Sequence, residues 1–132
     1  MSSVAQSVWE SASWEEHNYL EPKDAPPLIR ADVKRILSGD IEGTCEAVLL
    51  CCRPKEGSAG YVATEHVNAS LHGRPGTFVL QHAAALGGDT QHRIGFIVPN
   101  SATGELEGLS GTCLYGHDED GKPMLRLEYT LD

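Results

Sequence analysis

The sequence is short of positive charge. Its 132 residues include 10 Lys and Arg against 19 Asp and Glu, which gives a formal net charge of −9 at pH 7. Phosphate binding requires concentrated Lys and Arg side chains, whereas here the basic residues are scattered and their longest cluster is Lys34-Arg35. We therefore expect neither nucleic acid nor an anionic membrane as a partner, and we expect the acidity to serve solubility.

Long apolar runs are also missing. No stretch approaches the roughly 18 consecutive apolar residues of a membrane-spanning segment. The first residues, Met1 to Ser7, have neither the basic head nor the apolar core of a secretory signal. The sequence therefore predicts a cytoplasmic protein. Its length and its 40% hydrophobic and 22% charged residues are those of one globular domain.

Motifs for metal binding and nucleophilic catalysis are absent from the sequence. There is no His-x-His, His-x-x-x-His, Cys-x-x-Cys or Gly-x-Ser-x-Gly segment, and a metal site is expected to show close ligand pairs. We expect neither a metal nor a cofactor. The cysteines suit a reducing compartment and are interpreted as small buried hydrophobic residues; they are Cys45, Cys51, Cys52 and Cys113.

What the sequence does contain is a two-residue alternation of apolar and polar side chains, with almost no helical periodicity. The alternation predicts eight strands, over residues 6–14, 28–38, 43–53, 60–71, 76–86, 91–99, 106–116 and 123–131. Short, evenly spaced strands with tight turns fit a barrel or a sandwich. Only a closed barrel removes the exposed sheet edges.

Alternation also predicts which side chains point inward. In the strand over 60–71, Tyr61 and Glu65 share the apolar face, and Glu65 is its one carboxylate. Arg35 is the only charge on the apolar face of 28–38, and Tyr129 lies on the apolar face of 123–131. For the strand over 91–99, the expected inward set is His92, Ile94, Phe96 and Val98.

The strands over 60–71 and 76–86 are expected to pair as a hairpin around Gly73-Arg74. If Leu71 lies opposite Gly76, then Glu65 lies opposite His82. This register directs Phe78, Leu80 and His82 inward, whereas a slip by one residue would turn them outward.

Glu65 and His82 are the candidate catalytic residues. A carboxylate on an apolar face carries a desolvation penalty unless it is protonated, paired or hydrogen-bonded. With His82 as partner, Glu65 is a candidate general acid or base, and Arg35, Tyr61 or Tyr129 could stabilise a developing oxyanion. The structural alternative is a buried pair that fixes the strand register. Apolar contacts to a ligand would come from Phe78, Leu80 and Phe96.

Several glycine-punctuated segments resemble a bacterial family known as domain of unknown function 3224. The resemblance rests on Gly73-Arg74-x-Gly76-x-Phe78-Val79-Leu80-Gln81-His82 and on Thr103-Gly104-Glu105-Leu106-x-Gly108-Leu109-x-Gly111. It runs from about Leu28 to the C-terminus, so residues 28–132 are expected to be the family-like core and 1–27 an N-terminal strand or extension of one domain. The resemblance implies an all-β fold, a closed eight-stranded antiparallel barrel resembling allene oxide cyclase.

That resemblance extends to function only by analogy with the cyclases and isomerases of similar barrels. A first hypothesis is a cofactor-independent isomerase or cyclase that acts on a lipophilic small molecule in the barrel interior. A second is a non-catalytic carrier or sensor of such a ligand. A third is a solid-cored barrel that acts through its outer surface. Association into a homo-oligomer is compatible with each of them.

Overall fold

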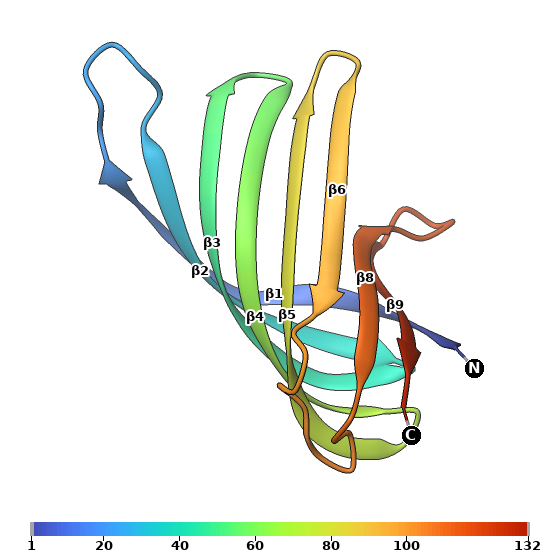
Figure 1. Cartoon of the computed structure of the whole chain (residues 1–132). Helices are drawn as coiled ribbons and strands as arrows, with labels where there is room; N and C mark the ends of the chain where they lie inside the picture. Colours follow the sequence, from blue (N-terminus) through green and yellow to red (C-terminus); the bar gives the residue numbers. More distant parts are fainter. Residues whose placement is uncertain (1, 132) are drawn as a thin grey trace.

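A computed structural model of the chain describes residues 2–131 and consists of one antiparallel β-sheet (Figure 1). The first and last positions of the expected single domain 1–132 lie outside the described residues. No helix in the described range is long and apolar enough to cross a membrane. The strands are β1 (Ser3–Leu20), β2 (Leu28–Gly39), β3 (Ile41–Lys55), β4 (Ser58–Leu71), β5 (Arg74–Gly87), β6 (Thr90–Ile97), β7 (Thr103–Gly104), β8 (Ser110–His117) and β9 (Pro123–Thr130).

Eight of these strands pair in a ring, in the order β1, β2, β3, β4, β5, β6, β8, β9 and back to β1. All of the pairings are antiparallel. Strand β1 completes the ring because it pairs with β2 on one side and with β9 on the other. The short β7 pairs with β5 only. The expectation of an all-β, antiparallel fold is confirmed.

The ring has two ends along the strand direction, and the strands extend to different lengths at these ends. Strands β8 and β9 have 8 residues each, whereas β3, β4 and β5 have 14 or 15. Figure 1 shows β3 to β6 extending well beyond β8. Strands β6 and β8 pair at a single position, Phe96 opposite Thr112. We call the end with the β4–β5 turn the closed end and the end with the β3–β4 and β5–β6 turns the open end.

An apolar core fills the closed end. Leu106 and Leu109, from the segment between β7 and β8, are fully buried there. They pack with side chains from the inner faces of the strands, which include Leu37, Ile41, Val67, Leu71, Phe78, Leu80, Leu125 and Leu127. A second apolar cluster lines β2, β3 and β4 towards the open end and consists of Ile29, Ala31, Val33, Ala47, Leu49, Cys51 and Ala63.

The predicted inner faces of four strands are confirmed. Arg35 on β2, Glu65 on β4, His82 on β5 and Tyr129 on β9 are all buried. In β2, β4 and β9 clear two-residue alternation fixes which side faces the core. In β5 the face followed from the expected hairpin pairing with β4.

The register predicted for the β4–β5 hairpin is wrong by two residues. The turn is the two-residue segment His72-Gly73, whose positive φ angles of 47° and 83° suit a tight hairpin. Glu65 consequently lies opposite Leu80, and His82 lies opposite Ala63. A shift by two residues leaves each side chain on its predicted face, so Glu65 and His82 become diagonal neighbours.

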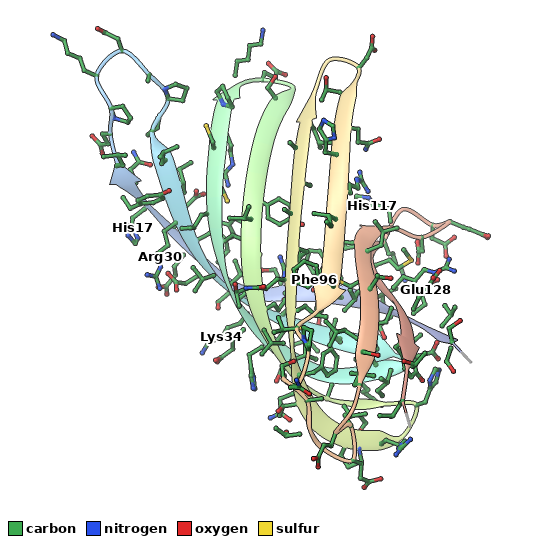
Figure 2. The ribbon with its side chains drawn as sticks, in the orientation of Figure 1. His17, Arg30, Lys34, Phe96, His117 and Glu128 are labelled. Atoms are coloured by element: carbon green, nitrogen blue, oxygen red, sulfur yellow. The ribbon has the colours of Figure 1, made fainter. Side chains whose placement is uncertain are left out.

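The inner face predicted for β6 is wrong. Ile94 and Phe96 are 64% and 40% exposed, whereas Gly95 and Ile97 are buried. The reason is a close crossing of β6 and β8, since a Cβ atom on Gly95 would lie 2.6 Å from the carbonyl oxygen of Cys113. Only glycine fits the inner position there, so its larger neighbours face outward. Figure 2 labels Phe96 on β6.

Two predicted strand boundaries are also wrong. The segment 6–14 is part of the longer β1, which contains an irregularity between Ser11 and Ser13 that short-range alternation does not reveal. The predicted strand 106–116 begins only at Ser110, because residues 105–109 form turns after the short β7. Gly104 and Gly108, with φ of 66° and 92°, provide the backbone conformations that these turns need.

Candidate functional site

The inner face next to the apolar core carries a buried polar cluster centred on Glu65. Glu65 is 0% exposed. Arg35 Nη1 donates to Glu65 Oε2 at 2.6 Å, and His82 Nε2 lies 3.1 Å from Glu65 Oε1. The hydroxyl of Tyr115 on β8 also donates to Oε1. Both carboxylate oxygens are therefore occupied by protein donors.

Arg35 is held by aromatic rings as well as by Glu65. Its guanidinium carbon lies 4.6 Å from the ring centroid of Trp9 and 5.3 Å from that of Tyr115. A cation this close to an aromatic ring face is attracted by the ring quadrupole. Trp9 and Tyr115 thus link β1 and β8 to the Arg35–Glu65 charge pair, whose two residues lie on β2 and β4.

Glu65 remains ionised in this environment. Burial by itself raises the pKa of the carboxyl group, but the hydrogen bonds from His82 and Tyr115 and the charge of Arg35 outweigh burial and hold the pKa at about 2. Burial also opposes the charge of Arg35, yet the neighbouring carboxylate raises the pKa of the guanidinium. The two residues form a buried ion pair.

His82 connects Glu65 to Tyr61. The Tyr61 hydroxyl lies 2.8 Å from His82 Nδ1. Because Nε2 faces an ionised carboxylate, the tautomer with a proton on Nε2 leaves Nδ1 to accept a hydrogen bond from Tyr61. Burial raises the pKa of Tyr61, so Tyr61 is a neutral phenol at pH 7. The result is a hydrogen-bonded chain from Tyr61 through His82 to Glu65.

A cavity of about 350 Å³ opens next to this chain, between β5, β6 and β8. Its polar and aromatic lining consists of Trp9, Tyr61, His82, Arg93, Tyr115 and His117. Figure 2 labels His117 near the open-end tip of β8. Among residues 2–131, neither Glu65 nor any other carboxylate belongs to the lining. The cavity therefore reaches the proton chain at Tyr61 and His82.

Two buried N–H donors have no acceptor within residues 2–131. They are Trp9 Nε1 and Arg35 Nε. Buried side-chain donors in proteins are hydrogen-bonded with few exceptions. Trp9 lines the cavity with its side chain, but its indole nitrogen is itself buried.

The cysteines of the site are not activated. Cys113 lines the cavity, but burial, together with the charge of Glu65, raises the pKa of its thiol to about 12. Burial also raises the pKa of Cys45. A thiol in this state is a poor nucleophile. Within the described range, no group of three or more His, Cys, Asp or Glu side chains is arranged to hold a metal ion.

The structure brings together four of the eight residues that the sequence indicated. Arg35, Tyr61, Glu65 and His82 form one connected cluster. The other four residues lie elsewhere: Phe78 and Leu80 are fully buried in the closed-end core, Tyr129 is bonded to His72 at that end, and Phe96 is on the outer face.

Tyr115, Trp9 and Arg93 belong to the site but were not among the residues that the sequence indicated. Tyr115 shares the inner face of β8 with Cys113, so alternation over 106–116 could have placed it inside. Its contact with Glu65 joins positions 50 residues apart, and no short-range pattern predicts such a contact. Trp9 and Arg93 reach the cavity only because β1 completes the ring and β6 lies beside β8.

Comparisons with other proteins identify the family but not an activity. The family model described as "Protein of unknown function (DUF3224)" matches residues 5–129. The match includes most of β1, which precedes the segments on which the sequence resemblance rested. No curated protein sequence matches the chain.

One solved structure is similar to the whole chain. It is the crystal structure of a protein of unknown function from the DUF3224 family of Shewanella oneidensis MR-1, with a TM-score of 0.87 and 28% sequence identity. The alignment covers 100% of this chain and 99% of that chain. Taken with the family model over residues 5–129, these findings show that the chain belongs to the DUF3224 family.

Proposed function

We propose that this protein binds a lipophilic small molecule in the cavity at the open end and moves a proton on it, as a cofactor-independent isomerase or cyclase. One observation carries the proposal. A hydrogen-bonded chain begins at Tyr61 in the cavity lining, passes through His82 and ends at a buried ionised carboxylate. A carboxylate, an imidazole and a phenol in series are suited to general acid–base catalysis.

The proposed step keeps atoms and electrons balanced. Tyr61 Oη takes a proton from a carbon next to a carbonyl group of the substrate, while its own proton passes to His82 Nδ1. The electron pair of the broken C–H bond delocalises onto the carbonyl oxygen. In a β,γ-unsaturated carbonyl compound the electron pair extends to the γ-carbon, and Tyr61 returns a proton to that carbon while His82 Nδ1 gives its proton back to Tyr61 Oη. The double bond moves into conjugation with the carbonyl group, and no oxidant, reductant or cofactor is consumed.

Glu65 and Arg35 act as positioning residues in this scheme. The Glu65 carboxylate holds His82 in one tautomer and stabilises the imidazolium that forms when His82 accepts the proton. Arg35 in turn keeps Glu65 ionised despite its burial. The sequence-based assignment of Glu65 to proton transfer thereby becomes an indirect role, since both of its oxygens are bonded to protein groups.

The cavity lining supports a lipophilic ligand with one polar end. Three aromatic side chains and the imidazole of His82 form much of the wall, and its volume of about 350 Å³ lies at the small end of ligand pockets. Arg93 and His117 supply polar groups to the same wall, where the carbonyl oxygen on which negative charge develops would lie.

Two measurements test this proposal. The first follows binding of the apolar fluorophore 1-anilinonaphthalene-8-sulfonate to the native fold. The second uses NMR in D₂O to follow exchange of the α-protons of a bicyclic aromatic ketone such as 2-tetralone. We expect saturable fluorophore binding and enzyme-dependent exchange. Tyr61→Phe should slow exchange by about 10²-fold or more, the usual effect of removing a general acid–base group.

Tyr129→Phe is the matched control, because Tyr129 is another hydrogen-bonded tyrosine but lies at the closed end. It should leave the exchange rate unchanged. Equal effects of the two substitutions would contradict the proposed role of Tyr61. Absence of both binding and exchange would remove the small-molecule site altogether.

The second candidate function is a non-catalytic carrier or sensor. It is favoured by the pairing of both Glu65 oxygens with protein donors, since a carboxylate held in this way serves to fix His82 and Tyr61 for binding a ligand headgroup. In that case the fluorophore binds and competes with the ketone, while α-proton exchange stays at the rate of the buffer.

Two finer sequence-based expectations belong to this proposal as well. Closure of eight strands in a ring supports a barrel resembling that of allene oxide cyclase. A cytoplasmic location is supported by Cys45, Cys51, Cys52 and Cys113, all of which are free thiols, because reducing compartments keep thiols unpaired.

A further inference from the structure

The outer face of the sheet carries an exposed apolar patch directly behind the candidate site. One row of paired residues, Leu50 on β3, Val62 on β4, Ala83 on β5 and Ile94 on β6, crosses four strands. Val48 and Phe96 stand at the two ends of the adjacent row. Leu50, Val62, Ile94 and Phe96 are between 40% and 64% exposed. We call these six residues the outer patch.

The outer patch is free of charge. Between Val48 and Phe96 the second row holds Thr64 and Gln81, whose side chains hydrogen-bond to each other at 3.2 Å. The two rows together contain eight positions and no Lys, Arg, Asp or Glu, although 22% of the chain is charged. A contiguous exposed apolar patch of this kind marks an interaction surface.

From this surface we infer that the protein forms a symmetric dimer in which the outer patches of two copies pack face to face. The outer patch lies on a sheet face and not on the free edges that β1 and β6 have at the open end, so two copies meeting there would associate by packing of sheet on sheet. In a two-fold dimer each patch must be complementary to itself.

The side-chain sizes within the patch meet that requirement. The row that runs from Leu50 to Ile94 has large side chains at both ends, and its smallest side chain is that of Ala83. The surface is hollowed there, since two adjoining depressions of about 670 and 350 Å³ both include Val62, Ala83 and Ile94 in their walls. A two-fold axis beside Ala83 allows Ile94 of each copy to enter the depression of the other.

Charge favours a second copy over an unlike partner. A basic partner would be drawn to the carboxylates of a chain with net charge −9, and these lie outside the patch. Two copies, by contrast, meet at an uncharged surface, so their mutual repulsion acts only through more distant charges that salt screens. Dimerisation should therefore strengthen with ionic strength.

The size of the outer patch predicts a weak, reversible dimer. Two rows over four strands cover an area about 14 Å by 7 Å between outermost Cα atoms, well below the roughly 800 Å² that each partner contributes to a standard interface. We expect a dissociation constant on the order of 100 μM or weaker.

Sedimentation velocity of the full chain from 10 to 500 μM, at low and high NaCl, tests the inference. Wild type should shift from monomer to dimer with concentration, and the shift should begin at lower concentration in high salt. Val62→Lys should move the midpoint at least 10-fold upward by placing a charge in the centre of the interface. Asn68→Lys is the matched control, because it adds the same charge to the outer face of β4 outside the patch.

Ile94→Ser is a second, charge-neutral variant, and circular dichroism melting checks that each variant is folded. A wild-type chain that stays monomeric throughout, or a dimer that Val62→Lys and Ile94→Ser leave intact, overturns the inference. Weakening of the dimer by salt would also overturn it, because that result indicates an ionic interface. Ala83 and Ile94 also border the candidate cavity, whereas Val62 does not. The α-proton exchange rate of Val62→Lys therefore distinguishes loss of the dimer from loss of the proposed function.

Discussion

The closed and open ends of the ring are built from the same strands but are stabilised in different ways. At the closed end, Val67 of β4 lies opposite Phe78 of β5, and both side chains are fully buried among apolar residues. One inner-facing position further along, Glu65 lies opposite Leu80 and heads a polar cluster. Apolar burial stabilises the first region, whereas the second depends on a charge whose partners are all in place.

The two ends should therefore respond differently to substitution. Truncation at the closed end should reduce stability in proportion to the cavity it creates. Substitution at the open end should have effects that depend on which partner is left behind. Four changes distinguish the stability of the closed end from that of the open end, and their expected effects on the free energy of unfolding decrease in the order given.

Phe78→Ala should destabilise the protein by about 4 kcal/mol, the usual cost of removing a fully buried aromatic ring. Phe78 is 0% exposed and contributes no polar atom to the candidate site. Urea unfolding should therefore show a lower midpoint, while the folded variant still binds the fluorophore. Loss of binding at a concentration of urea where the variant is folded would show that the two ends are not separate.

Arg35→Met should destabilise by about 3 kcal/mol or more, because it leaves the Glu65 charge buried without its cationic partner. The double variant Arg35→Met/Glu65→Leu should recover most of this loss, since removing both members of a buried ion pair is often neutral. Urea unfolding of both variants and wild type gives the comparison. A double variant less stable than the single one would show that Glu65 supports the fold through His82 and Tyr115 alone.

The contrast also explains how far sequence reasoning can reach. Alternation placed Arg35 and Glu65 on the inner face because their strands are regular and one-sided. The expected hairpin pairing with β4 placed His82 on the same face. Alternation failed for Phe96, where the close approach of β8 forces Gly95 inward. The site depends on the contact between Tyr115 on β8 and Glu65 on β4. The sequence alone does not show that these two strands lie close together, because that follows only from the closure of the ring. The local sequence pattern therefore predicts which face of the sheet a side chain occupies. Its contacts with residues on other strands follow only from the topology.

Acid should destabilise the open end selectively. The pKa of Glu65 is lowered from 4.5 to about 2 in the folded state, so the unfolded chain binds more protons between these values. The resulting stabilisation is complete above pH 4.5 and is lost as the pH falls towards 2, by up to about 3 kcal/mol for a shift of this size.

Urea unfolding between pH 7 and pH 2 measures this loss. The Arg35→Met/Glu65→Leu variant is the control, because other carboxylates titrate in both proteins and only wild type has Glu65. The wild-type curve should fall more steeply below pH 4.5. Parallel curves would mean that the carboxyl group at position 65 titrates alike in the folded and unfolded chains.

Tyr61→Phe should have the smallest effect on stability, about 1 kcal/mol, which is typical for the loss of one hydrogen bond. Tyr61 is only half-buried, and its hydroxyl bonds His82 Nδ1 alone. Tyr129→Phe removes a comparable hydroxyl bonded to His72 at the closed end, so thermal unfolding should show similar losses for both. The two variants should separate in α-proton exchange, where only Tyr61 borders the cavity. A tyrosine that contributes little to stability but much to exchange is expected where the inner face serves chemistry, and similar effects on both measurements would make the open end a structural region like the closed one.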